Sequence, residues 1–392
     1  MTGTRILAVS AVLIATAGCA GAGGPAAVVP PSVASAITGA PELPAPIVQT
    51  IATGLRVPWG LAFLPDGTAL VTERGNDVPT FEQPTGRERP VDRSGVPRIL
   101  SVTPAGRVTE VQRLSEVDTR LGEGGLLGIA VSPGYATDRW VYVYYSSATD
   151  NRIARLHLGS PPEPILTGIP VSSDSNGGAR FHLGGRLAFG PDGMLYASVG
   201  ETYFDRNIAQ DRDNLGGKIL RLTPDGKPAP GNPFPDSPVW TYGHRNVQGL
   251  AWDALGRMYA SELGDKTYDE LNVIQPGRNY GWPAVEGVST NPDYTNPIAT
   301  WTPTAIASPS GIAILNDHIY LACLAGQTLY RLDLDGTHPQ TLLNHTYGRF
   351  RTLATAPDGS LWATTSNRDQ GGREDRIPLT PEDDRILRIT VQ

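Results

Sequence analysis

The chain has 392 residues, of which 45 are glycine and 35 are proline, and only 18 % are charged. This composition favours many short strands joined by tight turns over long helices, so the sequence predicts an all-β protein whose single domain uses most of the length. The net charge of −7 comes without a cluster of basic residues, which argues against nucleic acid as a partner and leaves small neutral ligands open.

The N-terminus has the features of an export signal. Arg5 precedes a short apolar run that is too short to span a bilayer, and small residues follow it. The end of this segment, Thr16-Ala17-Gly18-Cys19, resembles a bacterial lipobox, although Thr16 stands where such sites usually have leucine. We expect residues 1–18 to be a signal peptide and Cys19 to carry lipid, with a plain secretory signal as the alternative.

Residues 19–45 predict a flexible tether. They are rich in alanine, glycine and proline, and they contain too few large apolar side chains to pack. The expected location is therefore the outer face of the cell membrane, held by the lipid anchor alone, or else a secreted or periplasmic one. Residues 46–392 are expected to form the folded domain. If Cys19 is lipidated, Cys323 is the one remaining thiol and the chain forms no internal disulfide.

One strand-turn-strand signature then recurs six times, with turns rich in proline, aspartate, asparagine and glycine. The copies lie at residues 60–74, 128–146, 185–201, 249–263, 311–325 and 351–367. A third strand follows each copy, and a fourth apolar stretch leads into the next unit. Four strands per unit and six units predict a six-bladed β-propeller, which a pair of β-sandwiches would not explain. A spare strand, Ile47 to Ala52, is expected to close the ring by pairing with the last blade.

In a propeller, the loops that enter the innermost strands meet at one end of the central channel. The residues at these positions are Trp59, Glu123, His182, the group Arg245, Asn246 and Gln248, then Ser310, and the pair Arg349 and Arg351. Most are polar, so the sequence predicts a polar pocket on one face. One imidazole among guanidinium groups suits a neutral base beside an anionic ligand. A purely structural role for His182 remains open, and His244 is expected to shape the Arg245 loop.

At this point the residues resemble the PQQ-dependent soluble glucose and aldose sugar dehydrogenases, the glucose/sorbosone dehydrogenase family. The resemblance covers nearly the whole chain from about residue 47. The matching stretches are Gly124-GLLGIAVSPGY-Ala136, His182-LGGRLAFGPDGMLY-Ala197, Leu215-GGKILRLTPDG-Lys227, Tyr242-GHRNVQG-Leu250, Asp269-ELNVIQPGRNYGWP-Ala284 and Tyr347-GRFR-Thr352. The family fold is a six-bladed propeller, in agreement with the repeat count.

The resemblance implies roles for the pocket residues. His182 would take the proton from the anomeric hydroxyl of a sugar while hydride passes to the quinone. Arg245 and Asn246 would bind the quinone and stabilise the negative charge that develops on it. Arg349 and Arg351 would hold the cofactor carboxylates.

The resemblance also implies Ca²⁺, an ion that prefers oxygen ligands. Backbone carbonyls of Gly264 and Asp265 would hold one ion that polarises the quinone. Glu270 and the carbonyl of Tyr280 would hold a second ion. The alternative for Glu270 is a charged residue on the surface of a strand.

Three positions depart from the family pattern. A lysine of the cofactor site falls at Ala325, a glutamine falls at Glu123, and the stretch usually read as Glu-His-Gly-Pro is Glu-Leu-Gly-Asp at 262–265. One lost cation and one gained anion make the site less favourable for the tricarboxylate PQQ, unless Ca²⁺, Lys266 or Arg180 compensates.

Three functions follow as hypotheses. The first is oxidation of an aldose to its lactone at the cell surface, with electrons passed to an external acceptor. The second is a cell-surface propeller that binds a carbohydrate or a protein and has lost its cofactor. The third is a Ca²⁺-dependent hydrolase of the lactonase kind, for which the ring of carboxylates and asparagines around a central metal is missing.

Overall fold

The structure is a computed structural model that describes residues 44–75, 95–119, 122–171, 180–369 and 377–391. The predicted signal peptide, Cys19 and nearly all of the predicted tether lie outside the described residues. Most of the long polar loop between the second and third strands of the first unit also lies outside them.

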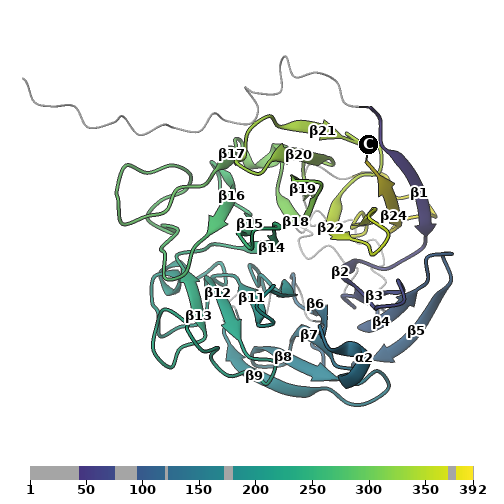
Figure 1. The fold of residues 1–392 in the computed structure, drawn as a ribbon, viewed down its shortest axis with the longest axis horizontal. Coiled ribbons are helices and arrows are strands. Elements are labelled where there is room, and N and C mark those ends of the chain that lie inside the picture. Colours follow the sequence, from purple (N-terminus) through teal and green to yellow (C-terminus); the bar gives the residue numbers. More distant parts are fainter. Residues whose placement is uncertain (1–43, 76–94, 120–121, 172–179, 370–376, 392) are drawn as a thin grey trace, which may run out of the picture.

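Six four-stranded antiparallel sheets surround a central axis as the blades of a propeller (Figure 1). The first three blades are β2 (Pro58–Phe63), β3 (Ala69–Glu73), β4 (Arg98–Val102) and β5 (Val108–Arg113); β6 (Leu126–Val131), β7 (Val141–Ser146), β8 (Asn151–Leu156) and β9 (Glu163–Ile169); and β10 (Leu187–Phe189), β11 (Leu195–Val199), β12 (Lys218–Leu222) and β13 (Val239–Tyr242). The last three are β14 (Val247–Trp252), β15 (Met258–Glu262), β16 (Asp269–Ile274) and β17 (Ala299–Trp301); β18 (Pro309–Leu315), β19 (His318–Cys323), β20 (Leu329–Asp333) and β21 (Gln340–Leu342); and β22 (Phe350–Thr355), β23 (Leu361–Thr365), β24 (Ile386–Thr390) and β1 (Ile47–Ala52).

The last blade joins the two ends of the folded domain. β1 runs antiparallel to β24, with Ile47 opposite Thr390 and Thr50 opposite Leu387. The blade therefore takes three strands from the end of the chain and one from its beginning (Figure 1). The predicted all-β propeller and its closure by the spare strand are both confirmed.

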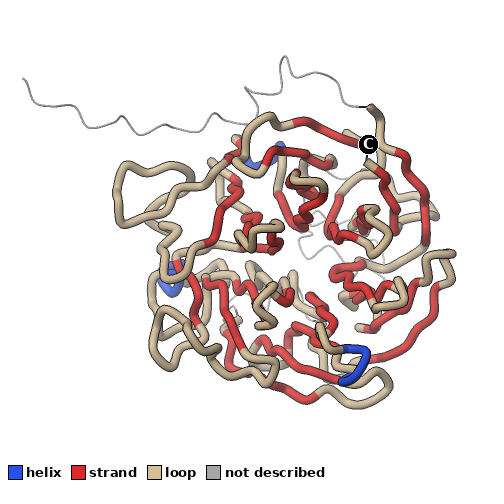
Figure 2. Tube along the Cα trace, viewed as in Figure 1, coloured by secondary structure: helices blue, strands red, loops and turns tan. Residues whose placement is uncertain are grey.

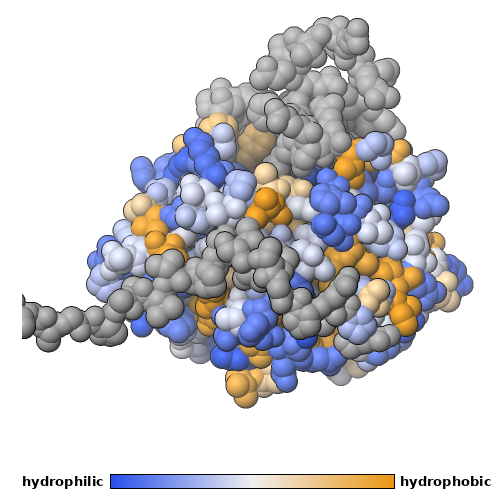
Figure 3. All heavy atoms as spheres, turned by 90° about the horizontal axis from the view of Figure 1, so that it is seen from above, coloured by the Kyte–Doolittle hydropathy of each residue, from blue (hydrophilic) through white to orange (hydrophobic). Residues whose placement is uncertain are grey.

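Within the described residues, helical structure is confined to short turns between strands (Figure 2). The segments are α2 (Tyr135–Asp138), η2 (Arg206–Ala209) and η3 (Thr304–Ile306), the last two being 3-10 turns. In the described ranges no helix has the length and apolar character to cross a membrane. In side view, hydrophilic and hydrophobic residues are interspersed over the coloured surface (Figure 3).

The hydrophobic core lies between neighbouring blades. Tyr142 and Ile153 of the second blade pack in one cluster with Leu195 and Leu220 of the third. An equivalent cluster joins the fifth blade to the sixth, and another joins the sixth to the first. Because each blade buries its faces against two neighbours, the inner strands are held rigidly, and so are the loops that precede them.

Candidate active site

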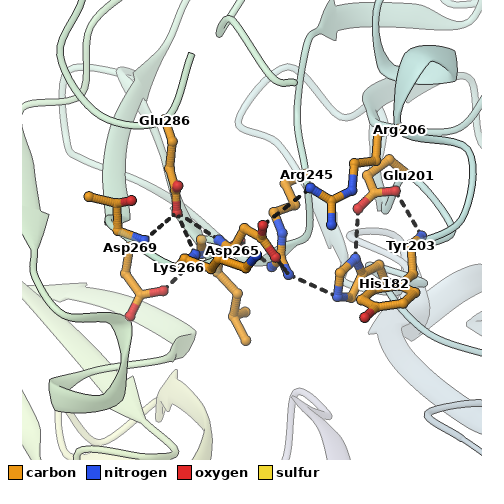
Figure 4. Close-up of polar contacts among 12 residues, drawn as sticks. His182, Glu201, Tyr203, Arg206, Arg245, Asp265, Lys266, Asp269 and Glu286 are labelled. Atoms are coloured by element: carbon orange, nitrogen blue, oxygen red, sulfur yellow. Dashed lines mark hydrogen bonds and ion pairs between the residues drawn. The ribbon is translucent and has the colours of Figure 1, made fainter. Parts of the chain in front are cut away.

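Two sets of loops meet at one mouth of the channel. One set precedes the innermost strands and carries His182 before β10 and Arg245 before β14. The other follows the second strands and carries Glu201 after β11 and Asp265 after β15. The close-up shows these side chains converging from the two sets (Figure 4).

His182 stands at the centre of this group and is 8 % exposed. Its Nδ1 atom lies 2.7 Å from Oε1 of Glu201, and its Nε2 atom lies 3.1 Å from Nη2 of Arg245. A carboxylate only accepts a hydrogen bond and a guanidinium only donates one. These partners therefore assign the proton to Nδ1 and leave a lone pair on Nε2, the form in which a histidine can accept a proton.

The backbone around His182 is fixed by its neighbours. Its φ angle is +51°, in the left-handed region that non-glycine residues seldom adopt. The N–H of His182 donates to Glu123, and the carboxylate of Glu201 also accepts the N–H of Tyr203. The ring of Tyr203 packs edge-on against the imidazole at 5.0 Å. The imidazole is thus held on both sides in one orientation.

Arg245 is anchored on several sides. Its Nη1 donates to the carbonyl of Leu263, and its Nη2 lies 3.5 Å from the Asp265 carboxylate. Burial lowers the pKa of Arg245, although the charges of Glu201 and Asp265 oppose this effect. In the described part of the molecule its buried Nε has no hydrogen-bond partner. Such an unpaired donor is costly unless a ligand satisfies it.

Asn246 and Gln248 occupy the same rim as predicted. Asn246 accepts the N–H of Gly184 through Oδ1, and within the described ranges its amide Nδ2 makes no hydrogen bond. Gln248 accepts hydrogen bonds from Ser310 and from Nη1 of Arg351. The asparagine amide is therefore a donor available to a ligand.

A second group on this face is strongly positive. Asp369 lies 2.9 Å from Nη2 of Arg74 and 2.5 Å from Nη2 of Arg351, and Arg349 is also close enough to act on its charge. Burial alone would raise the pKa of Asp369, but the arginines outweigh it and hold that pKa well below its usual range. Glu123 also acts on the charge of Arg351. Three guanidinium groups around one carboxylate leave a surplus of positive charge, which fits a ligand with several carboxylates.

The predicted calcium residues gather beside this face. Gly264, Glu270 and Tyr280 line one cavity of about 10 Å³, enough for a single water molecule or ion, together with Glu262 and Glu286. Burial and the charge of Glu262 raise the pKa of Glu270 well above its usual range. Crowded carboxylates that disfavour their own charge fit a cation among them.

The donor set is nevertheless incomplete as a carboxylate cage. No three aspartate, glutamate, histidine or cysteine side chains within the described ranges are placed to hold a metal. Any ion here would need backbone carbonyls and water besides Glu270. Asp265 does not line the cavity; its carboxylate instead lies 3.2 Å from Arg206 (Figure 4).

Sequence reasoning did not name Glu201, Arg74 or Asp369. Glu201 is the last residue of the repeat copy at 185–201, and Arg74 is the last residue of the copy at 60–74. Both positions are equivalent to that of Ala325 in the fifth copy. Comparing the ends of the second strands, as well as the starts of the first, would have found both. Of the two expected compensating cations, Arg180 is committed to carbonyls of Ser147 and Ala148 and to an ion pair with Asp118. Lys266 is exposed, so Arg74 is the cation that the structure adds.

Comparison with known proteins agrees with this geometry. The family model described as Glucose / Sorbosone dehydrogenase matches residues 55–373. A solved structure of a PQQ-bound aldose sugar dehydrogenase from Streptomyces coelicolor is 46 % identical and covers 90 % of this chain and 100 % of its own, with a TM-score of 0.76. Aldose sugar dehydrogenase YliI of Escherichia coli is 29 % identical over 81 % of this chain and 89 % of its own length. Quinoprotein glucose dehydrogenase B of Acinetobacter calcoaceticus is 30 % identical over 63 % of this chain and 54 % of its own. The chain belongs to the glucose/sorbosone dehydrogenase family.

Proposed function

We propose that this protein is a PQQ- and Ca²⁺-dependent dehydrogenase that oxidises an aldose to its lactone. The observation that carries the proposal is the hydrogen-bonded series Glu201, His182, Arg245 at the channel mouth, beside the arginines around Asp369. The PQQ-bound relative from Streptomyces coelicolor supports the choice of cofactor.

His182 is the proposed general base. A sugar whose anomeric hydroxyl replaces Arg245 at Nε2 gives its proton to that nitrogen. Glu201 then stabilises the imidazolium through the Nδ1–H hydrogen bond, because its carboxylate is already in place. PQQ, when bound, would supply the quinone carbon that accepts hydride from the anomeric carbon.

The arginines and Asn246 are the proposed binding groups for the cofactor. Arg74, Arg349 and Arg351 hold its carboxylates by their surplus charge. The Arg245 guanidinium and the Asn246 amide donate to the oxygen on which negative charge develops. Glu123 lies among these cations and weakens the attraction, so the predicted disadvantage at this position stays part of the proposal.

Calcium is proposed at two places. Glu270 and the carbonyl of Tyr280 would hold an ion in the small cavity that they line. The carbonyls of Gly264 and Asp265 would hold another toward the cofactor, where a cation offsets the charge of Glu123. A rise in the thermal midpoint with added Ca²⁺ but not Mg²⁺, absent in Glu270→Gln, would support the first site.

Residues 1–45 carry the signals for the proposed location of the protein. We propose export, lipidation at Cys19 and attachment to the outer face of the membrane, with the tether leaving the propeller free to meet its sugar. The reduced cofactor would pass its electrons to an external acceptor.

The test is reconstitution. Purified protein is loaded with PQQ and Ca²⁺, and dye reduction is followed with a panel of aldoses. We expect turnover, and we expect His182→Ala to lower kcat by about 10²- to 10⁴-fold. His338→Ala is the matched control, because that histidine is exposed and its ring contacts only Asp333 and Thr337 among the described residues.

Two results would contradict the proposal. Full activity in His182→Ala would refute the assigned base. No PQQ binding by calorimetry and no turnover would refute the dehydrogenase itself and would favour the hypothesis of a carbohydrate- or protein-binding propeller without cofactor.

A further inference from the structure

The half of the channel away from the active site contains a cavity of about 510 Å³. Residues of all six inner strands line it, so it lies on the axis around which the blades are arranged (Figure 1). Each inner strand contributes three consecutive residues, which lie toward its C-terminal end or, in β10, make up the whole strand, so the cavity opens on the face opposite His182. The lining residues are 61–63, 129–131, 187–189, 250–252, 312–314 and 353–355, together with Arg186.

Arg186 is the one charged side chain among the described residues that line this cavity. It directly precedes β10, whose three residues all line the wall, so it stands at the inner end nearest the active site. The residue is 8 % exposed. A buried guanidinium at the inner end of this cavity is unusual, since arginine is seldom buried unless a carboxylate pairs with it.

The contacts of Arg186 join it to three other blades. Its Nε donates to the carbonyl of Gln248 at 2.7 Å, and its Nη2 donates to the hydroxyl of Thr352 at 3.1 Å. The guanidinium also stacks on the ring of Trp59, 4.5 Å from its centroid. In the described part of the chain Nη1 makes no hydrogen bond and is not enclosed by protein, so it is open to the cavity.

Among the residues that the structure describes, no carboxylate compensates this charge. Burial, helped by the positive charge of Arg351, lowers the pKa of Arg186 to about 9. The carboxylate nearest to Arg351 is Asp369, which is already shared with Arg74. Burying a cation that has only neutral partners is energetically unfavourable, because the lost hydration is not replaced by an opposite charge. A small anion at Nη1 would offset this cost.

The walls of the cavity add hydrogen-bond donors. Each innermost strand is at the end of its four-stranded sheet and pairs with a neighbour on one side only. Its other edge faces the channel, where unpaired backbone N–H groups point inward. Phe63 and Phe189, the last residues of their strands, line the outer end of the cavity.

We propose that the channel binds a small monovalent anion, a halide or a small carboxylate, against Nη1 of Arg186 on the face opposite the active site. The site is separate from the proposed cofactor site, and its occupancy does not require PQQ. The ring of Trp59 lies 4.5 Å from the guanidinium of Arg186 and 5.9 Å from that of Arg351, so it contacts a cation of each site.

The test uses the full protein without cofactor and follows the ³⁵Cl⁻ resonance in solution. Chloride bound to the protein broadens this resonance in a saturable way, and unlabelled formate added at constant ionic strength displaces it if carboxylates share the site. We expect saturable broadening in the wild type and at least about tenfold weaker binding in Arg186→Gln, as for a lost charged hydrogen bond. Arg107→Gln, at an exposed residue, is the matched control and is expected to bind as the wild type does.

If Arg186→Gln does not fold, Arg186→Lys replaces it, because lysine keeps the positive charge. Saturable broadening of the chloride resonance by Arg186→Lys supports the site. Displacement by formate identifies a carboxylate as an alternative occupant, and no displacement restricts the site to halides. Broadening that is not saturable in the wild type overturns the proposal. So does saturable broadening that persists unchanged in Arg186→Gln, since the arginines around Asp369 would then be its source. Neither result depends on sugar oxidation.

Discussion

At the scale of single residues, Glu201 determines which nitrogen of His182 carries the proton. Glu201→Gln keeps the volume but allows the amide to donate to Nδ1, which would place the lone pair on the wrong side. We expect kcat to fall by about 10- to 100-fold with little change in KM, as is typical when a group that orients a catalytic residue is removed. Steady-state kinetics of the reconstituted enzyme checks this.

A conservative variant separates orientation from a merely structural role. Glu201→Asp keeps a carboxylate that can accept from Nδ1 of His182, so we expect it to recover part of the kcat that Glu201→Gln loses. Glu110→Gln, in exposed β5, is the control and should leave kcat unchanged. Equal kcat values for Glu201→Asp and Glu201→Gln would count against the assigned partner.

Asp369 gives a prediction on stability. Because Arg74 and Arg351 hold its folded-state pKa below the unfolded value, it stabilises the protein above about pH 4, and this stabilisation is lost as the pH falls. Asp369→Asn should therefore lower the free energy of unfolding by roughly 3–5 kcal/mol at pH 7, with a gap that narrows toward pH 3.

Urea unfolding from pH 7 to pH 3 measures this gap. Asp225→Asn serves as control, because its pair with Arg155 is exposed and worth at most about 1 kcal/mol. A gap of the same size at every pH would mean that Asp369 acts through packing and not through its charge.

At the scale of elements, the inner strands fit together because glycine lets their backbones approach. A Cβ at Gly60 would lie 2.8 Å from the carbonyl of Leu127, and one at Gly128 would lie 2.1 Å from the carbonyl of Gly185. Each contact joins one blade to the next near the active-site mouth. Small residues at these positions thus set how tightly the ring closes around the site.

Gly128→Ala tests this packing. The added methyl group would meet rigid backbone in the neighbouring blade, and we expect a loss of about 1–3 kcal/mol in the free energy of unfolding. Gly124→Ala is the matched control, since its Cβ would come no nearer than 3.3 Å to the hydroxyl of Ser146. Equal urea midpoints for the two variants would show that the blades can separate without cost.

At the scale of the whole molecule, the repeat explains what the sequence could and could not predict. Six equivalent copies imply a ring, and a ring brings His182 and Arg245 together although they stand 63 residues apart. The contact of Arg74 with Asp369 spans 295 residues and depends on the closure of the ring between the first and last blades. Arg74 and Asp369 each follow the second strand of a blade, where the loops vary in length. Their positions in the repeat therefore do not predict that they are in contact.

Ring closure itself is the last feature open to test. β1 supplies the fourth strand of the last blade, and it buries Ile51 and Ala52 against the first and sixth blades. Deleting residues 1–52 would remove this strand and expose the edge of β24, whereas deleting residues 1–44 would keep it. We expect the longer deletion alone to lower the free energy of unfolding by at least about 2 kcal/mol and to promote self-association through the open edge.

Urea unfolding and size-exclusion chromatography of the two truncations check this. If the blades were held chiefly by their own hairpins, the two would unfold alike, and the ring would be a stack of independent sheets. A selective loss in the longer deletion, together with weaker binding of PQQ, would show that the first strand keeps Arg74 and Arg351 on the same carboxylate. A strand at the outer edge of its blade would then be the one that keeps the arginines of the pocket in place.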